Sequence, residues 1–264
     1  MNHPTVLFSI DGMRPDGVLR ADTPCFHRLI ETGSSTLEAR TVMPSVTLPC
    51  HTSMLRGVDV SRHGITTNTF QPLARPVPSL FDVARTHGLK TGFFYNWGEL
   101  RDLMAPDSAL VEFSYSDPSF QDSDWIVARA AANQIATVPF DLLFVYLGYV
   151  DTSGHEFGWM SHQYLEAIAV ADRCVQHVLD AFTAGGTVPN VLVVSDHGGH
   201  ERSHGTEMPE DMTIPWILNG PNIRQGFEIK APVRIFDTCT TLAALCGLAP
   251  AKAWDGRIVS EAII

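Results

Sequence analysis

The stretch TVLFSIDG, residues 5–12, decides the fold: it is an almost uninterrupted apolar run that ends at Asp11. Two further apolar runs, 142–147 and 191–194, are followed shortly by Asp151 and Asp196. Continuous apolar runs of this length are typical of strands that are buried on both faces of a parallel sheet. Because ligands bind beyond the carboxyl ends of such strands, we expect the three aspartates to converge there.

Helix-like segments alternate with these strands. Thr23-Pro24 indicates the start of a helix that ends at Gly33, and Ser79 precedes a helix that ends at Gly88. The longest helical pattern covers His162–Phe182. Asp237 is the expected cap of a last helix that continues through Leu245. The alternation predicts an α/β fold, with a mainly parallel central sheet and helices on both faces. We expect a single domain over residues 1–264, with a small lid or pocket insertion around residues 70–121.

The composition excludes several classes of protein. Of the 264 residues, 45% are hydrophobic and 18% charged, which is typical of a globular chain with a large core. The formal net charge of −11 argues against a nucleic acid polymer as partner. No run approaches the roughly 18 apolar residues of a membrane span, so we expect no membrane partner and a cytoplasmic location. The five cysteines show no C-x-x-C spacing and are expected to be small buried hydrophobes.

Polar residues that could carry chemistry recur in short blocks along the chain. Thr47 precedes a proline at the expected start of a helix, where free N–H groups favour an anion or an alkoxide. The other candidates are Asp11 before a glycine turn, Asp151 and His155 across an expected turn after a strand, Asp196 and His197 on a tight loop, and His204 seven residues later.

Three carboxylates and three imidazoles without a thiolate suit Zn²⁺, with Mn²⁺ as the alternative. The set is large enough for two ions. Their four positive charges would be balanced by the three carboxylates and a Thr47 alkoxide. A nearby cation is also a physical means of making a threonine hydroxyl nucleophilic near neutral pH, because it stabilises the deprotonated form.

The sequence resembles the alkaline phosphatase superfamily, and most closely its type I phosphodiesterase/nucleotide pyrophosphatase branch. The matching blocks follow the family's order: residues 10–16, 44–51, 62–68, 151–155, 195–198 and 204–205. The resemblance implies an alkaline phosphatase-like three-layer sandwich. It also implies that the chain is a hydrolase of phosphate diesters or phosphoanhydrides.

The resemblance implies a role for each candidate residue. One zinc ion would be bound by Asp11, Thr47, Asp196 and His197, and the other by Asp151, His155 and His204. Thr47 would also be the nucleophile that forms a phosphothreonine intermediate. Asn68 would donate a hydrogen bond to a non-bridging phosphate oxygen, a role that its amide can fill.

Departures from the sequence patterns of the wider superfamily narrow the range of reactions that we expect. Thr47 stands where sulfatases carry Cys or Ser in a C-x-P-x-R pattern, and no arginine follows, so sulfatase chemistry is disfavoured. Asn68 stands in place of an arginine clamp, which favours a singly charged diester over a dianionic monoester as the substrate. The alternatives are a phosphomonoesterase or a phosphonate hydrolase that uses the same two metals, and a non-catalytic binding protein of this fold. We expect a small phosphate ester as the substrate. The sequence predicts neither which ester it is, nor which metal is loaded in the cell, nor the oligomeric state.

Other polar and aromatic residues are expected to be structural. We expect His51 to orient the loop after Thr47, and His200 to lie outside the metal ligands. Arg14 and Arg202 are expected to be solvated, although either could contact an anion. The aromatic residues Phe70, Phe94, Tyr95 and Trp97 are expected to pack in a core or lid rather than to stack on a substrate.

Overall fold

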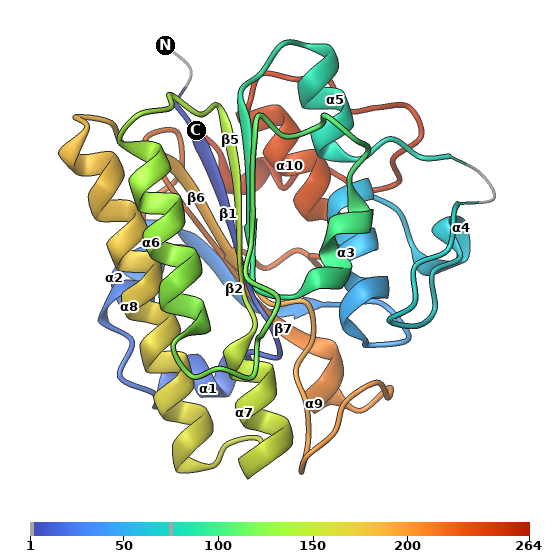
Figure 1. The fold of residues 1–264 in the computed structure, drawn as a ribbon, viewed down its shortest axis with the longest axis vertical. Coiled ribbons are helices and arrows are strands. Elements are labelled where there is room, and N and C mark those ends of the chain that lie inside the picture. Colours follow the sequence, from blue (N-terminus) through green and yellow to red (C-terminus); the bar gives the residue numbers. More distant parts are fainter. Residues whose placement is uncertain (1–2, 74–75) are drawn as a thin grey trace.

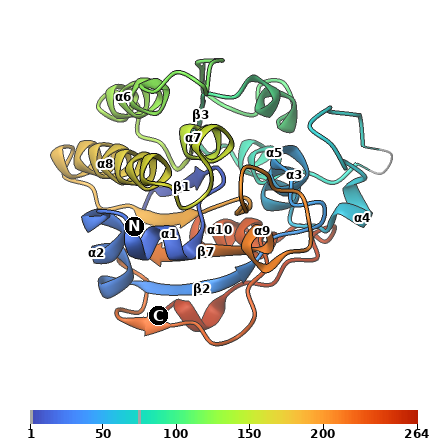
Figure 2. The same ribbon diagram turned by 90° about the horizontal axis from the view of Figure 1, so that it is seen from below.

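A computed structural model describes residues 3–73 and 76–264 and shows one eight-stranded sheet between two layers of helices (Figures 1 and 2). The strands are β1 (Thr5–Ile10), β2 (Ser34–Arg40), β3 (Thr91–Tyr95), β4 (Val111–Ser114), β5 (Leu142–Leu147), β6 (Asn190–Val194), β7 (Thr213–Asn219) and β8 (Phe227–Glu228). The α-helices are α1 (Pro15–Arg20), α2 (Pro24–Thr32), α3 (Thr47–Arg56), α4 (Val60–His63), α5 (Leu80–Thr86), α6 (Ser123–Ile135), α7 (Tyr149–Phe157), α8 (His162–Ala184), α9 (Pro209–Met212) and α10 (Asp237–Leu245). Two short 3-10 turns are η1 (Gly98–Leu103) and η2 (Ser260–Ala262).

The sheet is mainly parallel, as the sequence predicts. Its strand order is β4-β3-β5-β1-β6-β7-β2-β8, and the five strands from β4 to β6 run parallel. Strand β7 is antiparallel to both of its neighbours, β6 and β2. The three predicted apolar runs form β1, β5 and β6, which lie side by side at the centre of the sheet. The carboxyl ends of these strands therefore meet at one edge.

Alternation of side chains along the central strands builds two cores. In β1, Leu7 points to the face covered by α3, α5 and α10, whereas Phe8 and Ile10 point to the face covered by α2, α6 and α8. Strand β5 repeats this pattern with Phe144 and Val145 on opposite faces. Each strand is buried on both faces, which is why the sequence reads as unbroken apolar runs rather than as alternation.

The predicted helix boundaries hold, with two corrections in how the helices begin. Thr23 is the N-cap position of α2, but its hydroxyl donates to the carbonyl oxygen of Val18 instead of capping the helix. Asp237 is the first residue of α10 rather than its cap, and its carboxylate accepts hydrogen bonds from the main-chain N–H groups of Arg234 and Arg257. By contrast, Ser79 forms a capping box at the start of α5.

The segment 70–121, expected as a lid or pocket insertion, contributes α5, η1 and the two strands β3 and β4 to the layers of the fold. A cavity of about 850 Å³ lies among its loops, between Phe70 and Met104. Residues 74–75 of this segment lie outside the described residues. A role for this segment as a lid or pocket insertion stays a prediction.

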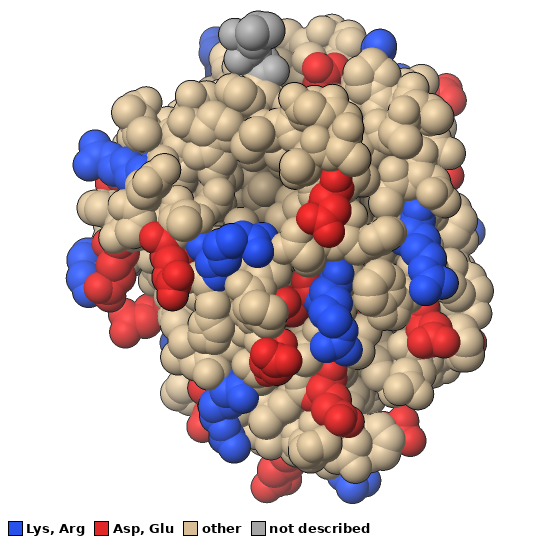
Figure 3. Space-filling view, turned by 90° about the vertical axis from the view of Figure 1, so that its left-hand side faces the viewer, with Lys and Arg blue, Asp and Glu red and all other residues tan. Residues whose placement is uncertain are grey.

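Among the described residues, none of the helices has the length and apolarity needed to cross a membrane. Figure 3 shows basic and acidic side chains interspersed on the face that lies at the left of Figure 1.

The junction between α8 and α2 yields a prediction on stability. Buried Asp172, in α8, accepts hydrogen bonds from the N–H groups of Cys25 and Phe26 in the first turn of α2, at 3.1 and 2.7 Å. Asp172→Ala leaves these donors without acceptors, so the free energy of unfolding should fall by about 1–3 kcal/mol in a denaturant titration. Exposed Asp180→Ala, on the same helix, should change it by less than about 0.5 kcal/mol. Equal losses would contradict this account of the junction.

Candidate active site

The site lies at the edge of the sheet where β1, β5 and β6 end. Asp11 follows β1 directly, and Asp196 lies two residues after β6. Gly12 turns the chain away from the strand with a φ of +68°, and a Cβ atom there would lie 3.0 Å from atoms of Asp151. Only glycine allows both this turn and this close approach. The expected convergence of the three aspartates is thus observed.

Thr47 is the first residue of α3, so the predicted helix N-terminus is present. Its side chain is buried, and its Oγ1 lies 3.3 Å from Nε2 of His197. The carboxamide Oδ1 of exposed Asn68 accepts a hydrogen bond from the N–H of Leu48 at 2.9 Å. This bond assigns the carboxamide orientation and leaves the Asn68 NH₂ group without a partner among the described residues.

Asp151 and His155 lie on helix α7, not across a turn as the sequence predicts. They are four residues apart and therefore share one face of the helix, with Nε2 of His155 3.5 Å from Oδ2 of Asp151. Gly154 gave the misleading turn signal. It is required inside the helix because a Cβ atom there would lie 2.7 Å from the indole of Trp159.

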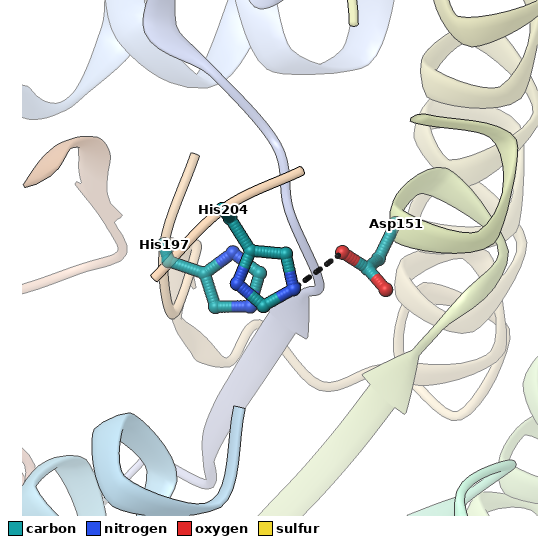
Figure 4. A group of neighbouring side chains, drawn as sticks. All are labelled: Asp151, His197 and His204. Carbon is teal, nitrogen blue, oxygen red and sulfur yellow. Dashed lines mark ion pairs between the residues drawn. The ribbon is translucent and has the colours of Figure 1, made fainter. Parts of the chain in front are cut away.

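His197 and His204 lie on the loop between β6 and α9, and their rings stack with centroids 3.8 Å apart. Figure 4 shows both rings next to Asp151, which approaches from α7. Nε2 of His204 is 3.7 Å from Oδ1 of Asp151. Nε2 of His197 is 3.3 Å from Oδ1 of Asp11 and 3.3 Å from Oδ2 of Asp196.

The three histidines share one pattern of hydrogen bonds. Their Nδ1 atoms lie 2.8–2.9 Å from main-chain carbonyl oxygens, those of Arg202, Gly198 and Ser45 for His155, His197 and His204 respectively. Since a carbonyl oxygen only accepts, each Nδ1 carries a proton, and a ring in its neutral form then presents the lone pair of Nε2. Each Nε2 thereby faces a carboxylate oxygen, and two acceptors at such distances need a proton or a cation between them.

In Asp11 and Asp196, hydrogen bonds engage one oxygen of each carboxylate. Oδ1 of Asp196 accepts hydrogen bonds from the N–H groups of Gly12 and His197, and Oδ2 of Asp11 accepts one from the hydroxyl of Tyr146. The opposite oxygens, together with Oδ1 of Asp151, are buried and lack a hydrogen-bond partner among the described residues. Buried polar atoms are rarely left unpaired, so these oxygens are suited to a ligand.

The surroundings of the carboxylates disfavour their ionised forms. Burial, together with the charges of Asp196 and Asp151, raises the pKa of Asp11 well above its usual range. Burial and the charge of Asp151 raise the pKa of Asp196 to about 8. Burial and neighbouring His204 hold the pKa of His197 well below its ordinary value. A neutral ring beside carboxyl groups that resist ionisation is the expected state of a cation site in the absence of its ion.

The residues present fit divalent metal ions. Two groups of possible ligand atoms lie within 4.8 Å of one another: those of Asp11, Asp196 and His197, and those of Asp151, His197 and His204. Two ligands of one tetrahedral zinc ion are about 3.4 Å apart, close to the 3.3–3.7 Å distances between the nitrogen and oxygen atoms here. His197 belongs to both groups. The side chain of His155 is 44% exposed and adjoins the second group, with its Nε2 3.5 Å from Oδ2 of Asp151 and its ring centroid 5.0 Å from that of His204.

His51 lies beside the first group, with its Nδ1 3.5 Å from Oδ2 of Asp196, whereas His200 bonds to Asp211, which belongs to neither group. Nε2 of His51 is occupied by the hydroxyl of Ser9 at 2.8 Å, and its Nδ1 donates to the carbonyl oxygen of Thr47. His51 thus bonds to Thr47, the first residue of α3, and burial lowers the pKa of His51 to about 4. His200 donates from Nδ1 to Asp211 at 2.7 Å.

Several supporting residues escaped the sequence analysis. Tyr146 reads as one more apolar residue of a buried strand, although its hydroxyl binds Asp11. Trp159 and Tyr164 both donate to the carbonyl oxygen of Gly12, at 3.0 and 2.8 Å. Arg14 is paired with Asp16 and with a main-chain oxygen rather than free to bind an anion. No local pattern marks the contacts of Tyr146, Trp159 and Tyr164, because their partners are far apart in sequence.

Comparisons with known proteins agree on one family. The model of the type I phosphodiesterase/nucleotide pyrophosphatase family matches residues 5–211. Human ectonucleotide pyrophosphatase/phosphodiesterase family member 1 is 25% identical over 229 residues, and rat family member 7 is 23% identical over 226. These matches cover 76% and 74% of the chain. The chain spans 24% of the first relative and 50% of the second.

The same fold occurs in a solved structure of an inactive variant of murine ectonucleotide pyrophosphatase/phosphodiesterase 5 in complex with AMP. The TM-score is 0.83 at 16% identity, and the match covers 99% of this chain and 100% of that one. The predicted α/β fold is therefore confirmed, helices on both faces included.

The raised pKa of Asp196 predicts how stability depends on pH in metal-free protein. Between about pH 4 and about pH 8 the folded state holds a proton at Asp196 that the unfolded chain has lost, so stability falls as the pH rises. In the presence of a chelator, the unfolding temperature should fall from about pH 5 to about pH 8, less steeply in Asp196→Asn. Identical slopes for the two proteins would contradict the buried-carboxyl account.

Tyr146→Phe tests whether the hydroxyl of Tyr146 prepares Asp11 for a cation. Removal of a hydrogen bond to a ligating carboxylate lowers metal affinity about 10- to 100-fold, so zinc affinity should fall by that factor in a chelator competition. Tyr95→Phe is the control, because Tyr95 is equally buried and donates to Glu112 outside the site. An unchanged affinity in Tyr146→Phe would refute this role.

Proposed function

The chain belongs to the type I phosphodiesterase/nucleotide pyrophosphatase family, and on that premise we propose that it is a metal-dependent hydrolase of phosphate diesters or phosphoanhydrides with Thr47 as its nucleophile. The two ions would be Zn²⁺, with Mn²⁺ as the alternative. Asp11, Thr47, Asp196 and His197 would hold one ion, and Asp151, His155 and His204 the other.

The observation that carries this proposal is the position of the Thr47 hydroxyl. It lies 3.3 Å from the lone pair of His197 Nε2, which in turn faces the unpaired oxygens of Asp11 and Asp196. The hydroxyl therefore stands beside a group of atoms that is suited to a cation. Bound divalent ions supply positive charge that favours both the deprotonated hydroxyl and the phosphate anion.

The proposed reaction is a two-step displacement at phosphorus, in which Thr47 is first the nucleophile and then the leaving group. Thr47 Oγ1 forms a bond to phosphorus while the bond from phosphorus to the leaving oxygen breaks, and the leaving group takes up a proton. Water then attacks the phosphothreonine, the bond from phosphorus to Oγ1 breaks, and the hydroxyl is restored. At the start of α3 the N–H of Thr47 has no acceptor within the helix and favours the negative charge of the phosphoryl group, whereas the N–H of Leu48 donates to Asn68 and Pro49 has no N–H.

Asn68 supports a diester over a monoester. Its carboxamide oxygen is held by Leu48, and its NH₂ group remains to donate to a non-bridging oxygen. A neutral donor suits the single charge of a diester, whereas a dianionic monoester is better matched by an arginine fork. A nucleotide is the proposed class of substrate, since the chain shares its fold with a protein that was solved with AMP.

Side-by-side hydrolysis of bis(p-nitrophenyl) phosphate and p-nitrophenyl phosphate by zinc-loaded protein tests this proposal. The diester should be cleaved faster, and Thr47→Ala should lower that rate by about a thousandfold or more, because the variant lacks the nucleophile. Thr52→Ala is a matched control: Thr52 is buried in the same helix, and its hydroxyl donates to the carbonyl oxygen of Leu48.

The control variant should keep its activity within a few-fold. Unchanged turnover by Thr47→Ala would show that Thr47 is not the nucleophile. A preference for the monoester would refute the role given to Asn68 and favour a phosphomonoesterase.

A further inference from the structure

The loop that carries His197 and His204 has little secondary structure of its own. Between β6 and α9 its only ladder contact among the described residues is an isolated bridge between His200 and Ser203. A side chain that presents a ligand atom must be held to within about 0.5 Å by packing and hydrogen bonds. The support for this loop must therefore come from outside it.

Asp211 provides that support. It lies in the short helix α9, its side chain is fully buried, and both of its carboxylate oxygens accept hydrogen bonds from the loop. Oδ1 accepts from Nδ1 of His200 at 2.7 Å. Oδ2 accepts from the N–H and the hydroxyl of Thr206 at 2.9 and 2.8 Å. The main-chain oxygen of Asp211 accepts from the N–H of Gly198 at 2.8 Å.

These contacts fix the loop at both ends. Gly198 adjoins His197, and Thr206 lies two residues beyond His204. One buried residue thus sets the separation between the two points at which the histidines are attached.

A second set of hydrogen bonds connects this arrangement to the nucleophile segment. The hydroxyl of Ser45 donates to the carbonyl oxygen of Thr206 at 2.9 Å, and the carbonyl oxygen of Ser45 accepts from Nδ1 of His204 at 2.8 Å. Ser45 lies two residues before Thr47. A shift of Thr206 would therefore move His204 relative to Thr47.

We propose that Asp211 is a positioning residue, which holds His197 and His204 at the spacing that two metal ions require. His200 serves this arrangement as a hydrogen-bond donor to Asp211 and not as a metal ligand. The inference rests on the proposed function, because it assumes that the two histidines bind metal.

Metal affinity of Asp211→Ala, measured by competition with a chromogenic chelator on the full chain, tests the proposal. Zinc affinity should fall about 10- to 100-fold, as expected for loss of a group that orients metal ligands. Asp237→Ala is the matched control, since Asp237 is also buried and its carboxylate accepts two main-chain N–H bonds, but on α10. Its unfolding temperature should drop while its zinc affinity stays within about twofold of wild type.

Two variants of His200 keep the test decisive if Asp211→Ala does not fold. His200→Ala should weaken zinc binding, whereas His200→Asn should restore most of it, because the asparagine NH₂ group takes the position of Nδ1. Asparagine is a poor zinc ligand, so rescue separates positioning from ligation.

Each outcome has a defined meaning. Zinc affinity equal to wild type in both Asp211→Ala and His200→Ala would overturn the inference and leave the proposed function intact. Equal losses in Asp211→Ala and Asp237→Ala, or failure of His200→Asn to restore binding, would also overturn it. If the wild-type protein binds neither Zn²⁺ nor Mn²⁺, the proposed function itself fails.

Discussion

Repulsion among three buried carboxylates at one edge of the sheet is the constraint on which the structure of the site depends. Asp11, Asp151 and Asp196 are brought together by three adjacent parallel strands, and burial, together with their mutual charges, raises the pKa values of Asp11 and Asp196. Such a cluster is stable in its ionised form only with compensating positive charge. No lysine or arginine among the described residues pairs with these three, which leaves protons or metal cations to supply it.

The other residues of the site are arranged around this requirement for positive charge. Three histidines donate from Nδ1 to main-chain oxygens and so direct their Nε2 atoms toward the carboxylates. Tyr146 and the N–H groups of Gly12 and His197 each occupy one carboxylate oxygen and leave the other available. Thr47 is placed beside these atoms by the start of α3. Preorganisation of this kind lets a cation bind without a large rearrangement of the protein.

Much of the fold and of the candidate site could be predicted from the sequence, because buried parallel strands and the polar residues that follow them are marked locally. Gly154 misled the prediction of α7, since its reason for being glycine is a contact with Trp159 and not a turn. Tyr146 and Asp211 could not be found, because their partners are distant in sequence or their local signals have ordinary explanations. An aspartate in the first turn of a helix, for example, reads as a complement to the helix dipole.

A crystal structure of zinc-loaded protein, with anomalous scattering recorded at the zinc edge, tests the central claim most directly. The account predicts two peaks about 4 Å apart. One should lie among Asp11, Thr47, Asp196 and His197, and the other among Asp151, His155 and His204. Absence of zinc from these carboxylates would contradict the claim that they are held together by metal ions.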